Sequence, residues 1–224
     1  MLRQTLGDEG FIQALPRMPR EFFARNALDV APDLLGLILA HKTPEGTTAG
    51  LITEVEAYAG PEDRACHAYG WRRTRRNEVM YGPPGFAYVY FTYGMYYCFN
   101  VVVASEGIPH AVLVRSLEPV FGMDLMLKRR KGRLPLTEGP GRMCQAMGIG
   151  REQNGKDLLG EELFIARPPE ELDISFEILT TPRIGIDYAG EAREYPWRFV
   201  ARLRGPRAQS QSAEDPRLPP VEVN

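Results

Sequence analysis

A long run of β-forming residues, 86–103, is the feature that most limits what this chain can fold into. Aromatic and β-branched side chains fill the run, and Gly94 interrupts it. This pattern predicts a β-hairpin with its tip near Tyr93 and Gly94. A buried hairpin explains residues such as Phe99, but it does not explain the tip. Tyr93 and Met95 flank the turn glycine, where burial is difficult, and exposed apolar groups at a loop tip usually contact a partner.

A second stretch, residues 52–67, begins as a strand that carries acidic and aromatic side chains. Because side chains alternate between the two faces of a strand, Glu54, Glu56 and Tyr58 are expected to point the same way. A polar turn then leads to His67. Carboxylates, a ring and an imidazole so close in sequence predict one wall of a reaction pocket. The alternative is an edge strand whose carboxylates face water.

A third segment, 111–116, is an apolar strand that contains Arg115. An arginine in such a strand needs a partner, since a buried charge without one is costly. Glu54, Glu56 or a phosphate group would serve as this partner.

Positive charge is distributed unevenly along the chain. The formal net charge of -2 argues against a nucleic-acid partner, but a whole-chain sum hides local clusters. Residues 71–77 hold four arginines, and residues 128–133 hold five basic side chains. Either run alone fits a solvated surface, whereas two runs beside an aromatic cluster favour contact with phosphate.

The length of 224 residues suits one sizeable domain and is short for two. With 44% hydrophobic and 25% charged residues, the composition is that of a soluble protein, and no run reaches the roughly 18 apolar residues of a membrane helix. The first residues lack the apolar run of a signal peptide, so we expect a cytoplasmic, nucleoid-associated protein without a membrane partner. The three cysteines are odd in number and widely spaced, which indicates neither a disulfide framework nor a zinc site.

The chain is expected to divide into three segments. Residues 1–18 show no hydrophobic period and are predicted to be a loose leader. Residues 19–204 are predicted to form the single domain, in which Pro19 and Pro32 suit the first turns of short helices. Residues 205–224 are rich in proline, glutamine, serine and arginine, and this composition predicts a disordered tail.

Four segments together resemble the alkyladenine (3-methyladenine) DNA glycosylase family. They are E-x-E-A-Y-x-G-P-E-D-x-A-x-H at 54–67, Y-V-Y-F-T-Y-G-M-Y-Y-C-x-N ending at Asn100, V-L-x-R-S-L-E-P at 112–119 and T-E-G-P-G-R-M-C-Q-A at 137–146. The resemblance runs from about Arg20 to Phe199. It implies one mixed α/β (α+β) domain with a curved, largely antiparallel sheet, flanking helices and a protruding β-hairpin that inserts into DNA.

The resemblance also implies an activity. A monofunctional purine DNA glycosylase of this family flips an alkylated or deaminated purine out of duplex DNA and hydrolyses its N-glycosidic bond, which starts base excision repair. The expected partner is therefore double-stranded DNA with damaged purines, bound by a monomer. Phosphate-loop, dinucleotide and metal motifs are missing from the sequence, so neither a cofactor nor a metal is expected.

The same resemblance assigns roles to individual residues. Glu56 would hold and deprotonate the attacking water, with Arg115 close to both. Asn100 would collide with the 2-amino group of guanine and so exclude a normal base, and Tyr93 would fill the gap that the flipped base leaves. The remaining expected contacts are Tyr58, His67, Tyr90 and Leu113 to the base, and Met95, Tyr96, Arg72, Arg76 and Arg142 to the DNA.

The resemblance ends before the C-terminus. The family usually closes with a strand followed by a G-N-x-x-V-S-like segment, whereas residues 202–210 of this chain read R-L-R-G-P-R-A-Q-S.

Two functions from other classes are compatible with parts of the sequence. A single-stranded nucleic-acid binding module would use the tyrosines for stacking and the arginines for phosphate, but it leaves Glu56 and Asn100 unexplained. A carbohydrate hydrolase would pair Glu56 with Glu54, Glu62 or Asp63, but it leaves the basic runs unexplained. Release of a free base from damaged duplex DNA separates the glycosylase from both.

Overall fold

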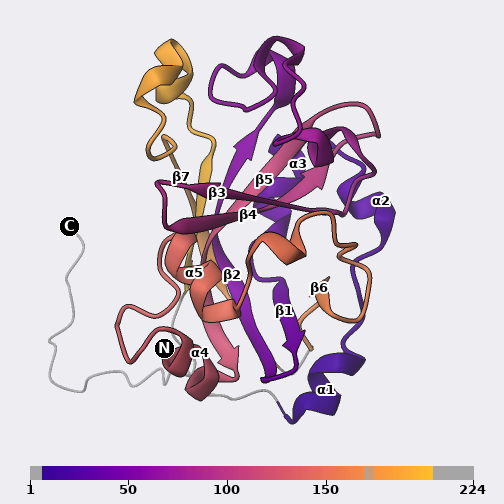
Figure 1. Ribbon diagram of the computed structural model, residues 1–224, viewed down its shortest axis with the longest axis vertical. Coiled ribbons are helices and arrows are strands. Elements are labelled where there is room, and N and C mark those ends of the chain that lie inside the picture. Colours follow the sequence, from indigo (N-terminus) through magenta and orange to yellow (C-terminus); the bar gives the residue numbers. More distant parts are fainter. Residues whose placement is uncertain (1–6, 170–171, 173, 204–224) are drawn as a thin grey trace, which may run out of the picture.

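The computed structural model describes residues 7–169, 172 and 174–203, which form one mixed α/β domain around a large antiparallel sheet (Figure 1). The expected single mixed α/β domain with a largely antiparallel sheet is therefore confirmed. Within these ranges the sheet has eight strands, which are β1 (Ile38–Thr43), β2 (Gly46–Tyr58), β3 (Ala87–Thr92), β4 (Tyr96–Val103), β5 (His110–Phe121), β6 (Leu163–Ala166), β7 (Phe176–Thr181) and β8 (Arg198–Leu203).

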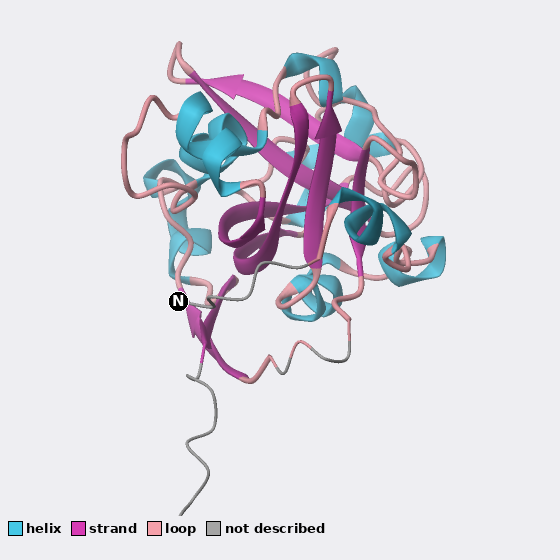
Figure 2. Cartoon of the chain, turned by 90° about the horizontal axis from the view of Figure 1, so that it is seen from below, coloured by secondary structure: helices cyan, strands magenta, loops and turns pink. Residues whose placement is uncertain are grey.

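In the described part of the chain, five short α-helices lie around this sheet, as the view from below shows (Figure 2). They are α1 (Glu9–Ala14), α2 (Arg20–Phe23), α3 (Ala27–Leu34), α4 (Met123–Arg129) and α5 (Pro140–Met147). Single 3₁₀ turns occur at Gly60–Glu62, Tyr69–Trp71, Glu78–Tyr81 and Arg151–Gln153, and a longer irregular one spans Asp187–Glu194. Within the described ranges, no helix is long and apolar enough to cross a membrane.

The sheet is organised around β2, which is long enough to have different neighbours along its two halves. The strand order is β3-β4-β5-β2-β1-β6. The first half of β2 pairs with β1, and its second half pairs with β8, which in turn pairs with β7. All of these pairings are antiparallel, and β3 and β4 run across the direction of β1 and β2 (Figure 1). The second half of β2 therefore lies between β5 and β8, in the middle of the sheet.

Side chains of the central strands alternate between the two faces of the sheet, so each face carries a different set of residues. Val55 and Ala57 of β2, Phe99 of β4 and Val112 of β5 point to one face and belong to the main hydrophobic core, which also includes buried residues of α3 and α5. The intervening residues of the same strands face the opposite side. The core thus fixes which side chains remain for a site.

The hairpin of β3 and β4 has its tip where the sequence predicts it. Thr92 pairs with Tyr96, and the tip residues Tyr93 and Gly94 have φ angles of 50° and 69°. Two successive left-handed residues fit the right-handed twist of a tight hairpin, and glycine adopts this conformation freely whereas tyrosine is strained there. Tyr93 is 79% exposed and Met95 is 65% exposed. Their apolar surfaces therefore face solvent at the tip.

Residues 7–18, the described part of the predicted leader, are packed against the domain rather than loose. The side chain of Asp8 accepts a hydrogen bond from the backbone N–H of Phe11 and caps α1, and Ile12 is fully buried. Met18 donates a backbone hydrogen bond to Ile165 of β6. A helix of six residues is too short to show a hydrophobic period, which explains why the pattern missed it. Residues 1–6 and the predicted disordered tail, 205–224, lie outside the described residues.

Two further expectations also differ from the structure. Pro32 is not in a first turn, because α3 begins after the capping residue Asn26 and contains Pro32 near its end. The second basic run is mostly engaged within the protein. Lys128 and Arg129 pair with Glu45, and Arg130 is buried and donates to Gln145.

Candidate active site

The centre of the site is a row of side chains that crosses four neighbouring strands. Tyr88 of β3 pairs with Asn100 of β4, Asn100 pairs with Leu113 of β5, and Leu113 pairs with Glu56 of β2. Directly paired residues in antiparallel strands point to the same face, so these four side chains lie side by side. Residues distant in sequence are in this way brought together on the face opposite the main core.

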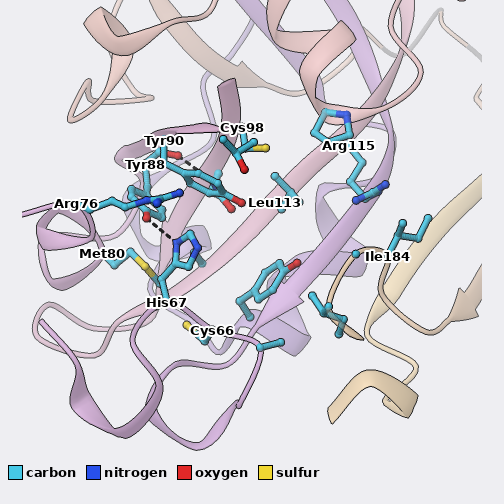
Figure 3. Close-up of a pocket in the computed structure, with 18 of the residues that line it drawn as sticks. Cys66, His67, Arg76, Met80, Tyr88, Tyr90, Cys98, Leu113, Arg115 and Ile184 are labelled. Carbon is cyan, nitrogen blue, oxygen red and sulfur yellow. Dashed lines mark hydrogen bonds between the residues drawn. The ribbon is translucent and has the colours of Figure 1, made fainter. Parts of the chain in front are cut away.

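Above this row lies a cavity of about 240 Å³. Figure 3 shows His67, Tyr88 and Tyr90 on one side of it, and Arg115 and Ile184 on the other. Of the residues expected from the sequence, the cavity lining includes Tyr58, His67, Arg76, Tyr90, Tyr93, Asn100, Leu113 and Arg115.

Aromatic rings form much of the cavity wall. The rings of His67 and Tyr90 lie 4.7 Å apart, centroid to centroid, and Tyr88 packs 5.4 Å from Tyr90. Burial raises the pKa of Tyr58 and of Tyr90, so both phenols stay protonated and can donate hydrogen bonds. Aromatic rings together with polar groups in one cavity suit the binding of a heteroaromatic base.

Glu56 lies directly behind the cavity wall and is fully buried. Its Oε2 accepts a hydrogen bond of 2.9 Å from the hydroxyl of Tyr58, and its Oε1 accepts one of 2.8 Å from the backbone N–H of Ile184. Nη1 of Arg115 is 3.2 Å from the same Oε1. The three residues that hold the carboxylate all line the cavity, although Glu56 itself does not.

An irregularity in the pairing of β2 with β5 explains how Arg115 reaches Glu56. The register shifts on either side of Glu54, so that Arg115 is an extra residue on β5 between Val114 and Ser116. A bulge of this kind redirects side chains and is common beside active sites. Nε of Arg115 and Oγ of Ser116 both donate to Glu54, each at 2.8 Å. Arg115 therefore bridges the two carboxylates of the strand.

His67 is held in a neutral state. Burial, followed by the nearby charges of Arg76 and Arg72, lowers the pKa of His67 to about 4. Its Nδ1 is 2.8 Å from the hydroxyl of Tyr88, which fixes the ring in the cavity wall (Figure 3). At neutral pH the ring therefore presents an uncharged edge to whatever occupies the cavity.

Asn100 and Leu113 form the floor of the cavity and are only 3% exposed. Nδ2 of Asn100 donates to the backbone carbonyl of Tyr88 at 3.1 Å. This hydrogen bond fixes the orientation of the carboxamide in the cavity floor.

The three arginines expected to contact DNA lie in different surroundings. Arg76 is part of the cavity wall, because its guanidinium lies 5.1 Å from the ring centroid of Tyr90 and donates to the carbonyl of Phe91. Arg72 lines a neighbouring groove. Arg142 is exposed on α5.

The hairpin packs against the start of α5. A Cβ atom at Gly141 would lie only 2.8 Å from the ring of Tyr96, which is half exposed beside Met95. The hairpin tip and Arg142 therefore belong to the same side of the molecule.

Sequence reasoning missed the segment 182–188, which closes the cavity on the side of Arg115. Ile184, Gly185, Ile186 and Tyr188 all line the cavity. Ile184 is 50% exposed and Tyr188 is 70% exposed. The available signal was an isolated arginine followed by apolar residues in an otherwise polar segment, R-I-G-I-D-Y at 183–188.

Of the three carboxylates that a carbohydrate hydrolase could use as a second catalytic group, Glu62 is exposed, and the other two are engaged in contacts within the protein. Glu54 accepts hydrogen bonds from Arg115, Ser116 and Arg198, and Asp63 is fully buried in an ion pair with Arg183. These contacts count against a paired-carboxylate mechanism at Glu56.

The cysteines of the site are free thiols. Burial raises the pKa of Cys66 to about 11 and also raises the pKa of Cys98, so both remain protonated and poorly nucleophilic. Among the described residues, no group of three or more His, Cys, Asp or Glu side chains is placed to hold a metal ion.

Known proteins resemble this chain over most of its length. The model of the methylpurine-DNA glycosylase (MPG) family matches residues 21–204. A relative from Clostridium acetobutylicum is 50% identical over 196 residues, which cover 83% of this chain and 94% of the relative. A relative from Desulfitobacterium hafniense is 48% identical, over 83% of this chain and 95% of its own length, and one from Bacillus cytotoxicus is 48% identical, over 82% and 95%. All three bear the name "Putative 3-methyladenine DNA glycosylase". The chain therefore belongs to the methylpurine-DNA glycosylase family, and it is a hydrolase of N-glycosyl bonds that acts on alkylated bases in DNA.

Proposed function

We propose that the protein is a monofunctional purine DNA glycosylase that flips an alkylated or deaminated purine out of the duplex and hydrolyses its N-glycosidic bond with a water activated by Glu56. The observation that carries this proposal is the environment of the Glu56 carboxylate. A fully buried carboxylate, shielded from bulk water, is held in a fixed orientation by three residues that line the cavity.

The flipped base would occupy the cavity between aromatic surfaces. Tyr58 would stack on one face of the base, and His67 with Tyr90 would contact the other. Extrusion from the duplex costs a few kcal/mol, and it costs least for a damaged or poorly paired base. Stacking on these rings offsets that cost, and the carboxamide of Asn100 would clash with the 2-amino group of guanine.

Hydrolysis would proceed through developing positive charge on the sugar. A carboxylate can take a proton from water and stabilise that charge, provided the water lies within about 2.6–3.2 Å of it. The cavity wall nearest to Glu56 is formed by Tyr58, Arg115 and Ile184, so the water would lie where these residues meet. Arg115 would hold both the carboxylate and the water in place, through the bulge that directs it to Glu56.

A water nucleophile agrees with the composition of the cavity wall. A glycosylase with lyase activity uses an amine to form a covalent Schiff base with the sugar. In the described part of the chain, no lysine lines the cavity. The products would therefore be a free base and an intact abasic strand.

The hairpin tip would enter the duplex from the side of the cavity. Tyr93 would fill the gap in the base stack, with Met95 and Tyr96 beside it in the minor groove. Arg72, Arg76 and Arg142 would contact the DNA backbone. A single copy presents the cavity and the hairpin on the same side, and the protein would act as a monomer.

The test is a single-turnover assay on a duplex that contains one hypoxanthine. The wild-type protein should release free hypoxanthine. Glu56→Gln should lower the rate constant by about a hundredfold or more, because the amide cannot accept the water proton. The amide still accepts hydrogen bonds from Tyr58 or Ile184, so binding to an abasic-site duplex should change little. More than a few per cent of the wild-type rate would remove Glu56 from this role.

A further inference from the structure

A buried ion pair lies behind the cavity wall and is not explained by the proposed chemistry. Arg183 and Asp63 come from segments more than a hundred residues apart, and both side chains have no exposed surface. The guanidinium meets the carboxylate in a two-pronged contact, with Nη1 donating to Oδ2 and Nη2 donating to Oδ1 at 2.8 Å. Neither residue lines the cavity.

The guanidinium of Arg183 lies over two aromatic rings. Its Cζ atom lies 4.8 Å from the ring centroid of Tyr58 and 4.9 Å from that of Trp197. Tyr58 lines the cavity and Arg183 does not, so the guanidinium covers the face of Tyr58 that points away from the cavity. The opposite face of the ring is left for a base. Arg183 therefore limits how far the ring of Tyr58 can move away from the cavity.

The same guanidinium also fixes the backbone next to Glu56. Nη1 donates to the carbonyl of Ala57, and Nη2 donates to the carbonyl of Ala192. Arg183 thereby ties the end of β2 to the segment that contains its own neighbour, Ile184. The carboxylate of Glu56 accepts two hydrogen bonds, and the backbone N–H of Ile184 donates one of them.

Asp63 extends this connection to the other side of the cavity. Its carboxylate accepts hydrogen bonds from the backbone N–H groups of Ala59, at 3.2 Å, and Ala65, at 3.0 Å. Ala65 lines the cavity two residues before His67. The ion pair thus joins the three segments that carry Tyr58, Ile184 and His67.

We propose that Arg183 and Asp63 are positioning residues of the glycosylase reaction, which set the plane of Tyr58 and hold the Ile184 amide on Glu56 without touching the DNA. A buried ion pair contributes little net stability, because the desolvation of two charges offsets their attraction. The two-pronged fork has instead the property of fixing orientation, which a lysine or an apolar side chain cannot reproduce. Its value in this site is geometric.

The inference rests on the proposed function, and its test compares chemistry with binding. Arg183→Lys keeps the positive charge. It loses the two-pronged contact with Asp63 and the planar group that lies over the rings of Tyr58 and Trp197. We expect the single-turnover rate constant for hypoxanthine release to fall at least about tenfold, because small misplacements in a reacting site are costly. The dissociation constant for an abasic-site duplex should stay within about twofold of the wild type, because the DNA contacts lie on other residues.

The chain offers a control arginine with the same kinds of contact, although its ion pair is partly exposed. Arg20 also pairs with an aspartate, Asp157, at 2.7 Å, donates to a backbone carbonyl and stacks on a ring, that of Phe86, but it lies away from the cavity. Arg20→Lys should keep the wild-type rate constant even if its melting temperature falls as much as that of Arg183→Lys. Asp63→Asn is the second variant, and it should reproduce the loss of rate with intact binding if Arg183→Lys does not fold.

The outcomes are distinct. A rate constant within twofold of the wild type in a folded Arg183→Lys or Asp63→Asn protein overturns the inference, and so does an equal loss in Arg20→Lys. A parallel loss of rate and binding also overturns it, since that result indicates general loosening of the domain. If the wild-type protein itself releases no base, the proposed function fails, and this failure is visible before any variant is measured.

Discussion

Tyr93 at the hairpin tip should be nearly irrelevant to folding and important for holding DNA. The side chain is 79% exposed, so about one fifth of its surface is buried. For a ring that buries on the order of 200 Å² when fully enclosed, this is about 40 Å², or about 1 kcal/mol of unfolding free energy. In a chain of this length, Tyr93→Ala should lower the melting temperature by only about 2–4 °C. Alanine keeps the same left-handed backbone requirement as tyrosine, so the turn itself is not relieved or newly strained.

The effect on DNA should be larger. A ring that fills the vacated stack opposes a restacking free energy of a few kcal/mol, so its loss should weaken binding to lesion and abasic duplexes by about tenfold to a hundredfold. Excision should slow most where the lesion is well paired, and a fluorescent base beside the lesion should report reduced unstacking. Ile178→Ala, which removes an apolar side chain that is 42% exposed on β7, is the control and should leave DNA binding and base flipping unchanged even where its melting temperature falls. A melting temperature many degrees lower with unaltered flipping would refute the reasoning, and Met95 would then be the next candidate.

Three other results are expected. Asn100→Ser should raise activity on normal guanine relative to hypoxanthine, measured by base release, whereas an unchanged ratio would mean that Asn100 serves only the carbonyl of Tyr88. Glu54→Gln should slow single-turnover excision less than Glu56→Gln, because Glu54 acts on the site only through Arg115, and the reverse order would exchange their roles. His67 has a folded-state pKa of about 4, below its ordinary value of 6.5. The unfolded chain therefore binds a proton first, and the unfolding free energy should fall by up to ~3 kcal/mol between pH 6.5 and 4 relative to His67→Gln. A His67 resonance that titrates above pH 6 by NMR would contradict this.

Local patterns predicted the parts of the site that depend on neighbouring residues in sequence. The hairpin and its exposed tip follow from β-forming residues interrupted by Gly94. The common orientation of Glu54, Glu56 and Tyr58 follows from strand alternation, and the structure connects all three, Glu54 and Glu56 through Arg115 and Glu56 through the hydroxyl of Tyr58. These features need no knowledge of the tertiary fold.

Features that depend on distant contacts were not predictable in the same way. Arg183 was not singled out, because its partner Asp63 lies 120 positions away and nothing local distinguishes a buried arginine from an exposed one. For a similar reason, the sequence does not show that the basic run at 128–133 is mostly engaged within the protein. A count of charges cannot show that Glu45 lies beside Lys128 and Arg129. Nor could alternation alone show that Glu56 lies behind the cavity wall, since this depends on the segment around Ile184.

The position of Glu56 is specified by the same alternation that forms the core. Val55 and Ala57, on either side of Glu56 in the chain, are fully buried in the main core. A shift of β2 by one residue would move both into the site and force a carboxylate into the apolar core, at a cost of several kcal/mol. The pairing with β5 is therefore strongly fixed at Glu56 and Leu113. Only two residues away the register is interrupted, and the bulge at Arg115 brings the arginine to the carboxylate. The sheet thus combines a rigid register at the carboxylate of Glu56 with a local irregularity at Arg115, the cation that orients this carboxylate, and the second depends on the first.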